Sequence, residues 1–453
     1  MIEENVEFTM NQIRLPDGSK MLKKQFTYGV ATASFQIEGG IDHRLPCIWD
    51  TFCATDGKIA DKSDGAVACD HYNRWQQDVE LIDSLGVDAY RLSISWPRVL
   101  TKSGELNPEG VAFYSNLLDG LNAKGIKPFV TLYHWDLPQH LEDQGGWLNR
   151  ETAYAFADYA EKIAKALKGK VHSFATFNEP FCSAYLGYEV GVHAPGLTGK
   201  QNGRQAAHHI LLAHGLGMQK LQAVSPETQN GIVLNFTPCY PASDETADQI
   251  AADLADQYIN QWYIKPIFDG AYPDIIEQLG QDWAPHIEPG DMEIIKQPLD
   301  FMGVNYYTRL TYSAPAVEGD FFHEHEHLMP RTDIGWEIYP QALTELLVDL
   351  NQRYSLPPVF ITENGAAMAD SLENGEVNDS DRVAYYHSHL NAVNDAIEQG
   401  VNVVGYFAWS LMDNFEWAEG YLKRFGIVYV DYDTQQRTIK QSGKSYRDLI
   451  SNR

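Results

Sequence analysis

The sequence predicts an α/β protein folded as a single closed (β/α)8 barrel, with long loops after the strands that build an active-site face. Eight short apolar runs alternate with longer amphipathic segments, and this alternation is typical of a closed parallel barrel. The 453 residues are 44% hydrophobic and contain no low-complexity linker or sharp change in composition, which favours one core. The longest stretches without periodicity, residues 41–69, 181–204 and 310–338, all follow predicted strands.

The predicted strands are short and almost entirely apolar, as expected for strands covered on both faces. They span residues 27–31, 89–93, 128–133, 173–177, 231–235, 301–305, 359–362 and 403–408. Between them, helical spacing of apolar residues covers residues 78–85, 112–124, 150–167 and 382–399. Asp379 and Ser380 precede the last of these and Gly400 follows it, which predicts a capped helix. An open, doubly wound sheet is the alternative, but no GxGxxG turn follows the first strand.

The composition argues against several partners. A formal net charge of −28 disfavours nucleic acid and anionic membranes. No segment reaches the apolar length of a membrane span, and the acidic N-terminus lacks the apolar region of a signal peptide. The cysteines are odd in number and form no CxxC pair: Cys47, Cys53, Cys69, Cys182 and Cys239. We therefore expect a cytoplasmic protein without a disulfide framework. We expect one catalytic domain over residues 1–453, with residues 1–20 as an N-terminal extension.

Two glutamates at strand ends predict the chemistry. Glu179 lies in a TFNEP sequence after the fourth predicted strand, and Glu363 lies in an ITENG sequence after the seventh. Either one alone would be explained as an acid that caps a loop. Together, at the same end of a barrel, they are what a glycosidase needs: one protonates the leaving oxygen, and the other attacks or supports the anomeric carbon.

Polar and aromatic residues gather at the other strand ends as well. Amides, carboxylates and imidazoles bind the hydroxyl groups of a sugar, and indole rings stack on its C–H faces. A single Trp is more often part of a core, but several beside Glu, Gln and His indicate a sugar site. The set comprises Gln36, Glu38, Arg91, Trp96, His134, Trp135, Asn178, Asn305, Tyr306, Tyr307, Asn364, Trp409, Glu416 and Trp417.

Seven motifs, in order, resemble the signatures of glycoside hydrolase family 1, the β-glucosidases and their relatives. They are FQIEG (35–39), YRLSISWPR (90–98), YHWDLP (133–138), NEP (178–180), GVNYY (303–307), TENG (362–365) and WSLMDNFEW (409–417). The resemblance runs from about residue 26 to residue 450. It implies a retaining TIM-barrel enzyme that needs no cofactor, with Glu179 as acid/base and Glu363 as nucleophile.

The resemblance also implies roles for the neighbouring residues. Arg91 and Tyr307 would hydrogen-bond the nucleophile with Asn305 nearby, and Trp409 would stack under the sugar ring. The residues implied to hold the substrate are Gln36, His134, Trp135, Asn178, Tyr307, Glu416 and Trp417, with Trp336 as an aglycone platform and Cys182, Leu186 and Tyr240 on the aglycone side. Arg91 and Tyr307 are expected to keep Glu363 ionised, whose charge in turn keeps Glu179 protonated.

Histidine clusters are explained structurally. His208, His209 and His214 lie in a helical segment without an HExxH motif, and the alternating sequence 323–327 (HEHEH) indicates a solvated loop. No metal site is predicted.

The sequence thus predicts a retaining exo-β-glycosidase that hydrolyses terminal β-D-glucosyl residues of small β-glycosides or cello-oligosaccharides through a covalent glycosyl-enzyme. β-Galactosides and β-fucosides are expected side substrates. A 6-phospho-β-glycosidase, a sugar-binding pseudoenzyme and a metal-dependent hydrolase are the alternatives. Relatives that take 6-phosphoglycosides carry Ser, Lys and Tyr where this chain has Glu416, Lys423 and Phe425. A carboxylate at Glu416 would accept sugar hydroxyls and repel a phosphate. Oligomeric state stays open.

Overall fold

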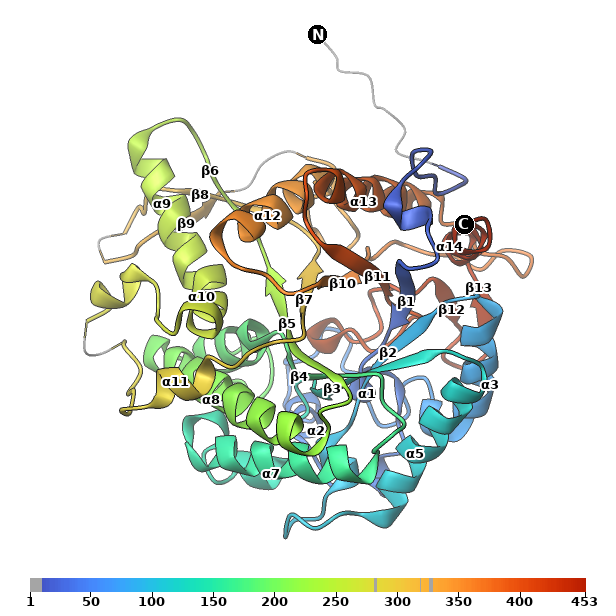
Figure 1. Ribbon diagram of the computed structural model, residues 1–453, viewed down its shortest axis with the longest axis horizontal. Coiled ribbons are helices and arrows are strands. Elements are labelled where there is room, and N and C mark those ends of the chain that lie inside the picture. Colours follow the sequence, from blue (N-terminus) through green and yellow to red (C-terminus); the bar gives the residue numbers. More distant parts are fainter. Residues whose placement is uncertain (1–9, 281–282, 318, 326–328) are drawn as a thin grey trace.

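The computed structural model describes residues 10–280, 283–317, 319–325 and 329–453. Eight parallel strands close into a barrel in the order β1-β11-β10-β7-β5-β4-β3-β2 (Figure 1). Their bounds are β1 (Thr27–Ala31), β2 (Ala89–Ser93), β3 (Lys127–Tyr133), β4 (Ser173–Asn178), β5 (Gln229–Phe236), β7 (Phe301–Tyr306), β10 (Val359–Asn364) and β11 (Val403–Trp409). The predicted barrel and its eight strands are confirmed, and the closed order excludes the open sheet.

Large rings fill the barrel interior below the site. Phe129, Phe301, Phe360 and Phe407 come from four different strands, and their ring centroids lie 4.9–6.3 Å apart in edge-to-face pairs. Glycine makes room for them, since a Cβ at Gly29 would lie 2.3 Å from the Phe407 ring. This packed layer forms a rigid floor, and the polar residues lie further along the same strands.

Helices surround the barrel (Figure 1). The main ones are α3 (His71–Ser84), α5 (Pro108–Ala123), α7 (Glu151–Ala166), α8 (Lys200–Val224), α12 (Pro340–Arg353), α13 (Ser380–Glu398) and α14 (Gln441–Ser451). The four predicted helices correspond to α3, α5, α7 and α13, although α3 begins seven residues before its predicted start at 78. Gly400 follows α13 with a φ of 95°, as a glycine after a helix end commonly does. Asp379 is the N-cap residue, but its carboxylate bonds Arg382 and Ser442 instead of the helix N–H groups.

The long loops contain more structure than the sequence predicts. Residues 181–204 begin with a π-helix, η4 (Cys182–Glu189), and residues 41–69 include η2 (Ile41–His43) and α2 (Ile48–Cys53). Strands β8 (Leu310–Ser313) and β9 (His323–His325) join β6 (Cys239–Pro241) in a small sheet beside α9 (Thr246–Asp256). A hairpin of β12 (Val428–Val430) and β13 (Arg437–Ile439) follows β11. Strands of three or four residues are too short to show a period.

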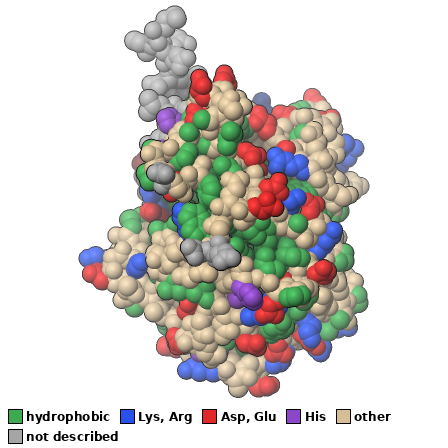
Figure 2. Space-filling view, turned by 90° about the vertical axis from the view of Figure 1, so that its left-hand side faces the viewer, with side chains coloured by type: hydrophobic (Ala, Val, Ile, Leu, Met, Phe, Trp, Pro, Cys, Tyr) green, Lys and Arg blue, Asp and Glu red, His purple; other side chains and the backbone are tan. Residues whose placement is uncertain are grey.

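The chain before the barrel packs onto α13 and α14. The Met10 N–H donates to the Ser380 carbonyl at 3.3 Å, and the Ile13 N–H donates to the Ser445 hydroxyl at 2.7 Å. Positions 1–9 of the predicted extension lie outside the described residues. Within the described chain, no helix combines the length and apolarity needed to cross a membrane. On the side that carries α9 and the small sheet, acidic and basic side chains are interspersed around hydrophobic ones (Figure 2).

Candidate active site

A cavity of about 620 Å³ opens where the strands end. Ten of the predicted site residues line it: His134, Trp135, Glu179, Asn305, Tyr307, Trp336, Glu363, Trp409, Glu416 and Trp417. The other three, Gln36, Arg91 and Asn178, are buried in the layer behind the wall. The barrel therefore brings together residues from seven of its strands or the loops after them. Cys182 and Leu186 also line the cavity, whereas Tyr240 donates its hydroxyl to Glu345 and is not among the lining residues.

Glu363 holds one strong donor on each carboxylate oxygen. Arg91 Nη1 donates to Oε1 at 2.6 Å, and the Tyr307 hydroxyl donates to Oε2 at 2.6 Å. Burial raises the pKa of Glu363, and the Arg91 guanidinium and the Tyr307 hydroxyl act against this by stabilising the ionised form. Glu363 is thus equipped to exist as a carboxylate inside the barrel.

Glu179 lies in a different environment at the end of β4. Its backbone has a φ of 50°, a left-handed conformation that is uncommon for a residue with a side chain. Oε1 accepts from Asn305 Nδ2 at 2.6 Å, and Oε2 accepts from the Cys182 thiol at 3.0 Å. Burial, and then the negative charge of Glu363, raise the pKa of Glu179 to about 7. The neighbours of the two carboxyl groups therefore act in opposite directions: those of Glu363 favour its ionised form, whereas burial and the charge of Glu363 favour the protonated form of Glu179.

A chain of hydrogen bonds behind the wall fixes the direction of each donor. Arg91 can only donate, so Asn178 Oδ1, 2.7 Å from its Nη2, is an acceptor. Asn178 Nδ2 then donates to His134 Nε2 at 3.1 Å, which leaves the imidazole proton on Nδ1. Burial and the charge of Arg91 hold the pKa of His134 well below its usual value. His134 is therefore a neutral imidazole with a donor at Nδ1.

Several buried polar atoms of this region have no hydrogen-bond partner within the described chain, among them Gln36 Oε1, His134 Nδ1 and Glu416 Oε2. Because buried polar groups are nearly always paired, such atoms mark places where a polar ligand can bind. Burial, and then the charges of Glu363 and Glu179, raise the pKa of Glu416 to about 8. This environment favours the carboxylic acid form of Glu416, which can donate as well as accept, over the carboxylate expected from the sequence.

Aromatic rings form the walls between these polar atoms. Trp417 and Trp409 each stack on His134, with ring centroids 5.9 and 5.8 Å from it. Trp135 lies 4.5 Å from Trp417 and donates its indole N–H to the Asn178 carbonyl at 2.9 Å. Trp336 packs on Tyr307 at 5.2 Å. Flat apolar faces beside unpartnered donors and acceptors suit a sugar ring.

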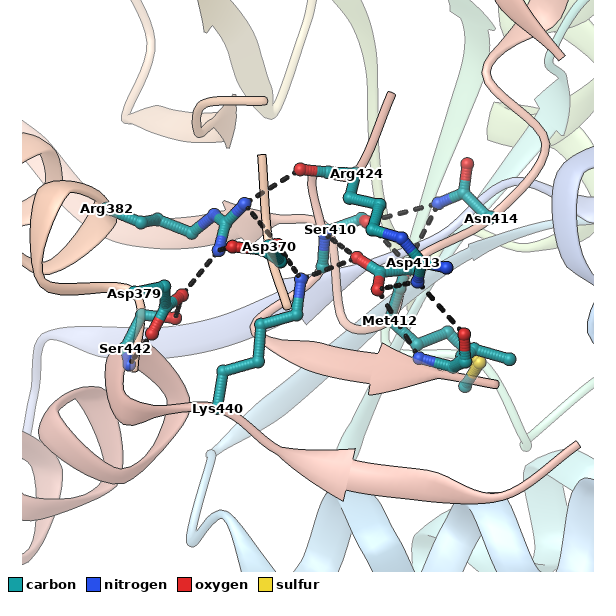
Figure 3. Close-up of polar contacts among 12 residues, drawn as sticks. Asp370, Asp379, Arg382, Ser410, Met412, Asp413, Asn414, Arg424, Lys440 and Ser442 are labelled. Carbon is teal, nitrogen blue, oxygen red and sulfur yellow. Dashed lines mark hydrogen bonds and ion pairs between the residues drawn. The ribbon is translucent and has the colours of Figure 1, made fainter. Parts of the chain in front are cut away.

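A buried ionic network supports the loop that carries Glu416 and Trp417 (Figure 3). Lys440 Nζ lies 2.5 Å from Asp370 and 2.6 Å from Asp413, and Arg424 contacts Asp413 at 2.6 Å. Arg382 completes the network by pairing with Asp370 and Asp379. Each of the three acids is matched by a base, so the network is electrically balanced. Sequence reasoning missed it because its members lie up to 70 positions apart.

The clustered histidines of α8 are held by hydrogen bonds within the protein. His208 bonds Tyr272 and Asp291, His209 bonds the Trp147 carbonyl, and His214 bonds Thr176. In the part of the chain that the structure describes, no three His, Cys, Asp or Glu side chains are grouped as metal ligands. Of the HEHEH sequence, residues 323–325 form the exposed strand β9, and the last two residues lie outside the described residues.

A closed barrel whose cavity holds two unlike carboxyl groups and aromatic walls defines a glycosidase-type site. The model of "Glycosyl hydrolase family 1" matches residues 18–453, and the chain belongs to this family. It is 48% identical to a "Beta-glucosidase" of Agrobacterium sp. over 94% of both chains. It is 44% identical to a "Bifunctional beta-D-glucosidase/beta-D-fucosidase" of Bifidobacterium breve, over 94% of this chain and 98% of that one. The solved GH1 β-glucosidase of Exiguobacterium antarcticum B7 superposes with a TM-score of 0.92 at 44% identity, covering 95% and 98% of the two chains.

Proposed function

We propose that this protein is a retaining exo-β-glycosidase that releases terminal non-reducing β-D-glucosyl residues, with β-fucosides and β-galactosides as further substrates. The observation that carries the proposal is the pair Glu179 and Glu363, which share one cavity but have unlike neighbours: Glu363 is paired with the cation Arg91, whereas the pKa of Glu179 is raised to about 7. Membership of glycosyl hydrolase family 1 and relatives named as β-glucosidases support the glycone, and the Bifidobacterium relative supports fucosides. The substrate is a small β-glycoside or a cello-oligosaccharide.

In the proposed mechanism, Glu363 attacks the anomeric carbon while Glu179 protonates the leaving oxygen. Arg91 and Tyr307 orient Glu363 and stabilise its charge before attack. Formation of the glycosyl ester removes that charge, so the pKa of Glu179 falls and its carboxylate can take a proton from water. One pair of residues thus serves both steps.

We assign glycone binding to the unpartnered polar atoms and the rings between them. Gln36, His134, Asn178, Glu416 and Trp417 hold the hydroxyls, Trp409 and Trp135 contact the ring, Asn305 orients Glu179, and Trp336 provides the aglycone platform. We further propose one catalytic domain over residues 1–453 and a cytoplasmic location, which the five unpaired cysteines favour.

A panel of nitrophenyl glycosides, with NMR of the first sugar released, tests this function. We expect turnover of the β-glucoside with β-glucose as first product and no change on adding EDTA. α-Glucose as the first product would contradict a retaining mechanism. Binding without turnover would favour a pseudoenzyme, and a loss on chelation that a divalent ion restores would favour a metal-dependent hydrolase.

A further inference from the structure

The thiol of Cys182 lies directly against the carboxyl group of Glu179. Cys182 begins η4, the π-helix that follows β4, and its side chain is 8% exposed in the wall of the cavity. Its sulfur donates to Glu179 Oε2 at 3.0 Å. Cys182 was expected only on the aglycone side, yet it contacts the carboxyl group to which the acid/base role is assigned.

The other oxygen of Glu179 faces a group that can only donate. Because Arg91 makes Asn178 Oδ1 an acceptor, the atom of Asn305 that lies 3.0 Å from it must be the amide nitrogen, Nδ2. The same nitrogen donates to Glu179 Oε1 at 2.6 Å. A carbonyl oxygen accepts better than the hydroxyl oxygen of a carboxylic acid, so the acid form of Glu179 carries its proton on Oε2. That oxygen is the one beside the sulfur.

We propose that Cys182 is a positioning residue for Glu179, which holds Oε2 as the oxygen that gives and takes the proton in both chemical steps. This inference rests on the function proposed above. A thiol donates to a carboxylate and accepts weakly from a carboxylic acid, so it can satisfy Oε2 in either protonation state. An aliphatic side chain would do neither.

The same oxygen, Oε2, gives up a proton in the first step and takes one back in the second. First, the proton on Oε2 passes to the leaving oxygen as its bond to C1 breaks and the bond from Glu363 to C1 forms. Then Oε2 takes a proton from water as the water oxygen bonds to C1 and the ester bond to Glu363 breaks. The thiol keeps its own proton throughout, because burial and the charge of Glu179 hold the pKa of Cys182 well above its usual value.

The variants Cys182→Ala and Cys182→Ser test the inference. Both lose the volume of the sulfur, and only Ser retains a donor. The other charged or titratable groups that face this pair, Glu363, Arg91 and Glu416, are the same in both. A donor to the carboxylate lowers the pKa of Glu179, and the basic limb of the pH profile of kcat/KM reports the pKa of this acid in the free enzyme. In the Ala variant, the midpoint of that limb should therefore move up by about half a pH unit or more. In the Ser variant it should stay at or below its position in the unsubstituted enzyme.

The dependence of kcat/KM on the leaving group provides a second test. Because misplacement of Oε2 impairs proton donation, Cys182→Ala should lower kcat/KM on cellobiose roughly threefold to tenfold and on dinitrophenyl β-glucoside less than about twofold. Cys182→Ser should recover most of the loss, and Cys53→Ala, outside the cavity wall, should lose nothing.

Equal losses on every substrate in the Ala and Ser variants, with the basic limb unmoved in both, would show that Cys182 is only a packing residue. If the unsubstituted enzyme fails to hydrolyse β-glucosides, the proposed function is wrong. If it turns them over normally and only the variant profiles stay unmoved, the inference on Cys182 alone is wrong.

Discussion

Single residues decide how the two carboxyl groups differ. Glu363 receives a guanidinium and a phenol, which stabilise negative charge, whereas Glu179 receives an amide and a thiol and lies close enough to Glu363 for its charge to be felt. The same side-chain type therefore meets opposite electrostatics within one cavity. Acid and nucleophile are separated by neighbours and not by residue identity.

Removing each carboxyl group should expose its role. Glu363→Ala should abolish turnover, and azide should partly restore it as α-glucosyl azide, because the anion enters on the emptied face. Glu179→Ala should lose roughly 10²- to 10⁴-fold on cellobiose and far less on dinitrophenyl β-glucoside, whose leaving group needs little protonation. Stopped assays with NMR of the azide adducts measure both. If the two variants lost both substrates equally, the division of roles would be refuted.

The residues at the glycone end predict discrimination against charged sugars. Phe425 lines the cavity without a hydroxyl, and the Lys423 ammonium is paired with Asp333 at 3.1 Å. The raised pKa of Glu416 weakens the repulsion expected from its carboxylate, but a phosphate would still meet the negative charge of Glu363, whose partner Arg91 is already engaged in an ion pair. At an effective dielectric near 20, like charges a few ångströms apart cost on the order of 3 kcal/mol.

We therefore expect kcat/KM on nitrophenyl β-glucoside to exceed that on its 6-phosphate by about a hundredfold or more. The pair of substrates differs only in the phosphate, so each serves as the control for the other. Comparable values would favour the 6-phospho-β-glycosidase.

At the level of elements, the helices and strands that a local pattern of residues encodes can be predicted from the sequence. Buried parallel strands are continuous apolar runs, so all eight were placed to within about two residues, and the site residues follow from where those strands end. The π-helix η4 leaves no such pattern, and neither does the contact of Cys182 with Glu179. The support beneath Glu416 depends on pairs such as Lys440 with Asp370, which only the folded barrel brings together.

A substitution at the buried start of α14 should therefore lower the free energy of unfolding more than a substitution on its exposed surface. Lys440 precedes this helix and is fully buried between two aspartates, so Lys440→Met leaves Asp370 and Asp413 with one cation too few. Breaking a buried pair in this way costs about 3–5 kcal/mol of unfolding free energy. Denaturant unfolding checks this value, and a raised KM for the glucoside would report displacement of the loop that carries Glu416.

Lys444→Met is the matched control, because Lys444 lies one turn further along the same helix and pairs at the surface with Glu376. It should cost less than about 1 kcal/mol. Equal costs for the two variants would show that the network does not stabilise the fold.

For the whole molecule, two sets of buried groups act in opposite directions on stability. Burial lowers the pKa of four histidines to about 3 or 4: His193, His209, His214 and His389. Between about pH 4 and pH 6.5 these side chains bind fewer protons in the folded chain than in the unfolded chain, so they make stability rise with pH there. The pKa values of Asp136 and Glu179 are raised to about 7 and that of Glu416 to about 8. From about pH 4 up to these raised values, the three acids retain protons that the unfolded chain has lost, so they make stability fall as pH rises. The four histidines outweigh them up to about pH 6.5, and above that pH only the fall caused by the acids remains.

We expect a maximum of thermal stability near pH 6.5 and a fall in Tm of roughly 3 °C by about pH 8.5. Because Glu416 has the highest of these pKa values, Glu416→Gln should raise Tm relative to the unsubstituted protein at about pH 8.5 and give little gain at about pH 5. Glu376→Gln removes the same charge at the exposed surface and should not change the shape of the profile. Added salt screens surface repulsion arising from the net charge of −28 but hardly affects a buried group, so the Glu416→Gln gain should persist at high ionic strength. A Tm that rises steadily through pH 8.5, or an equal gain from both variants, would show that buried acids do not govern the alkaline limb.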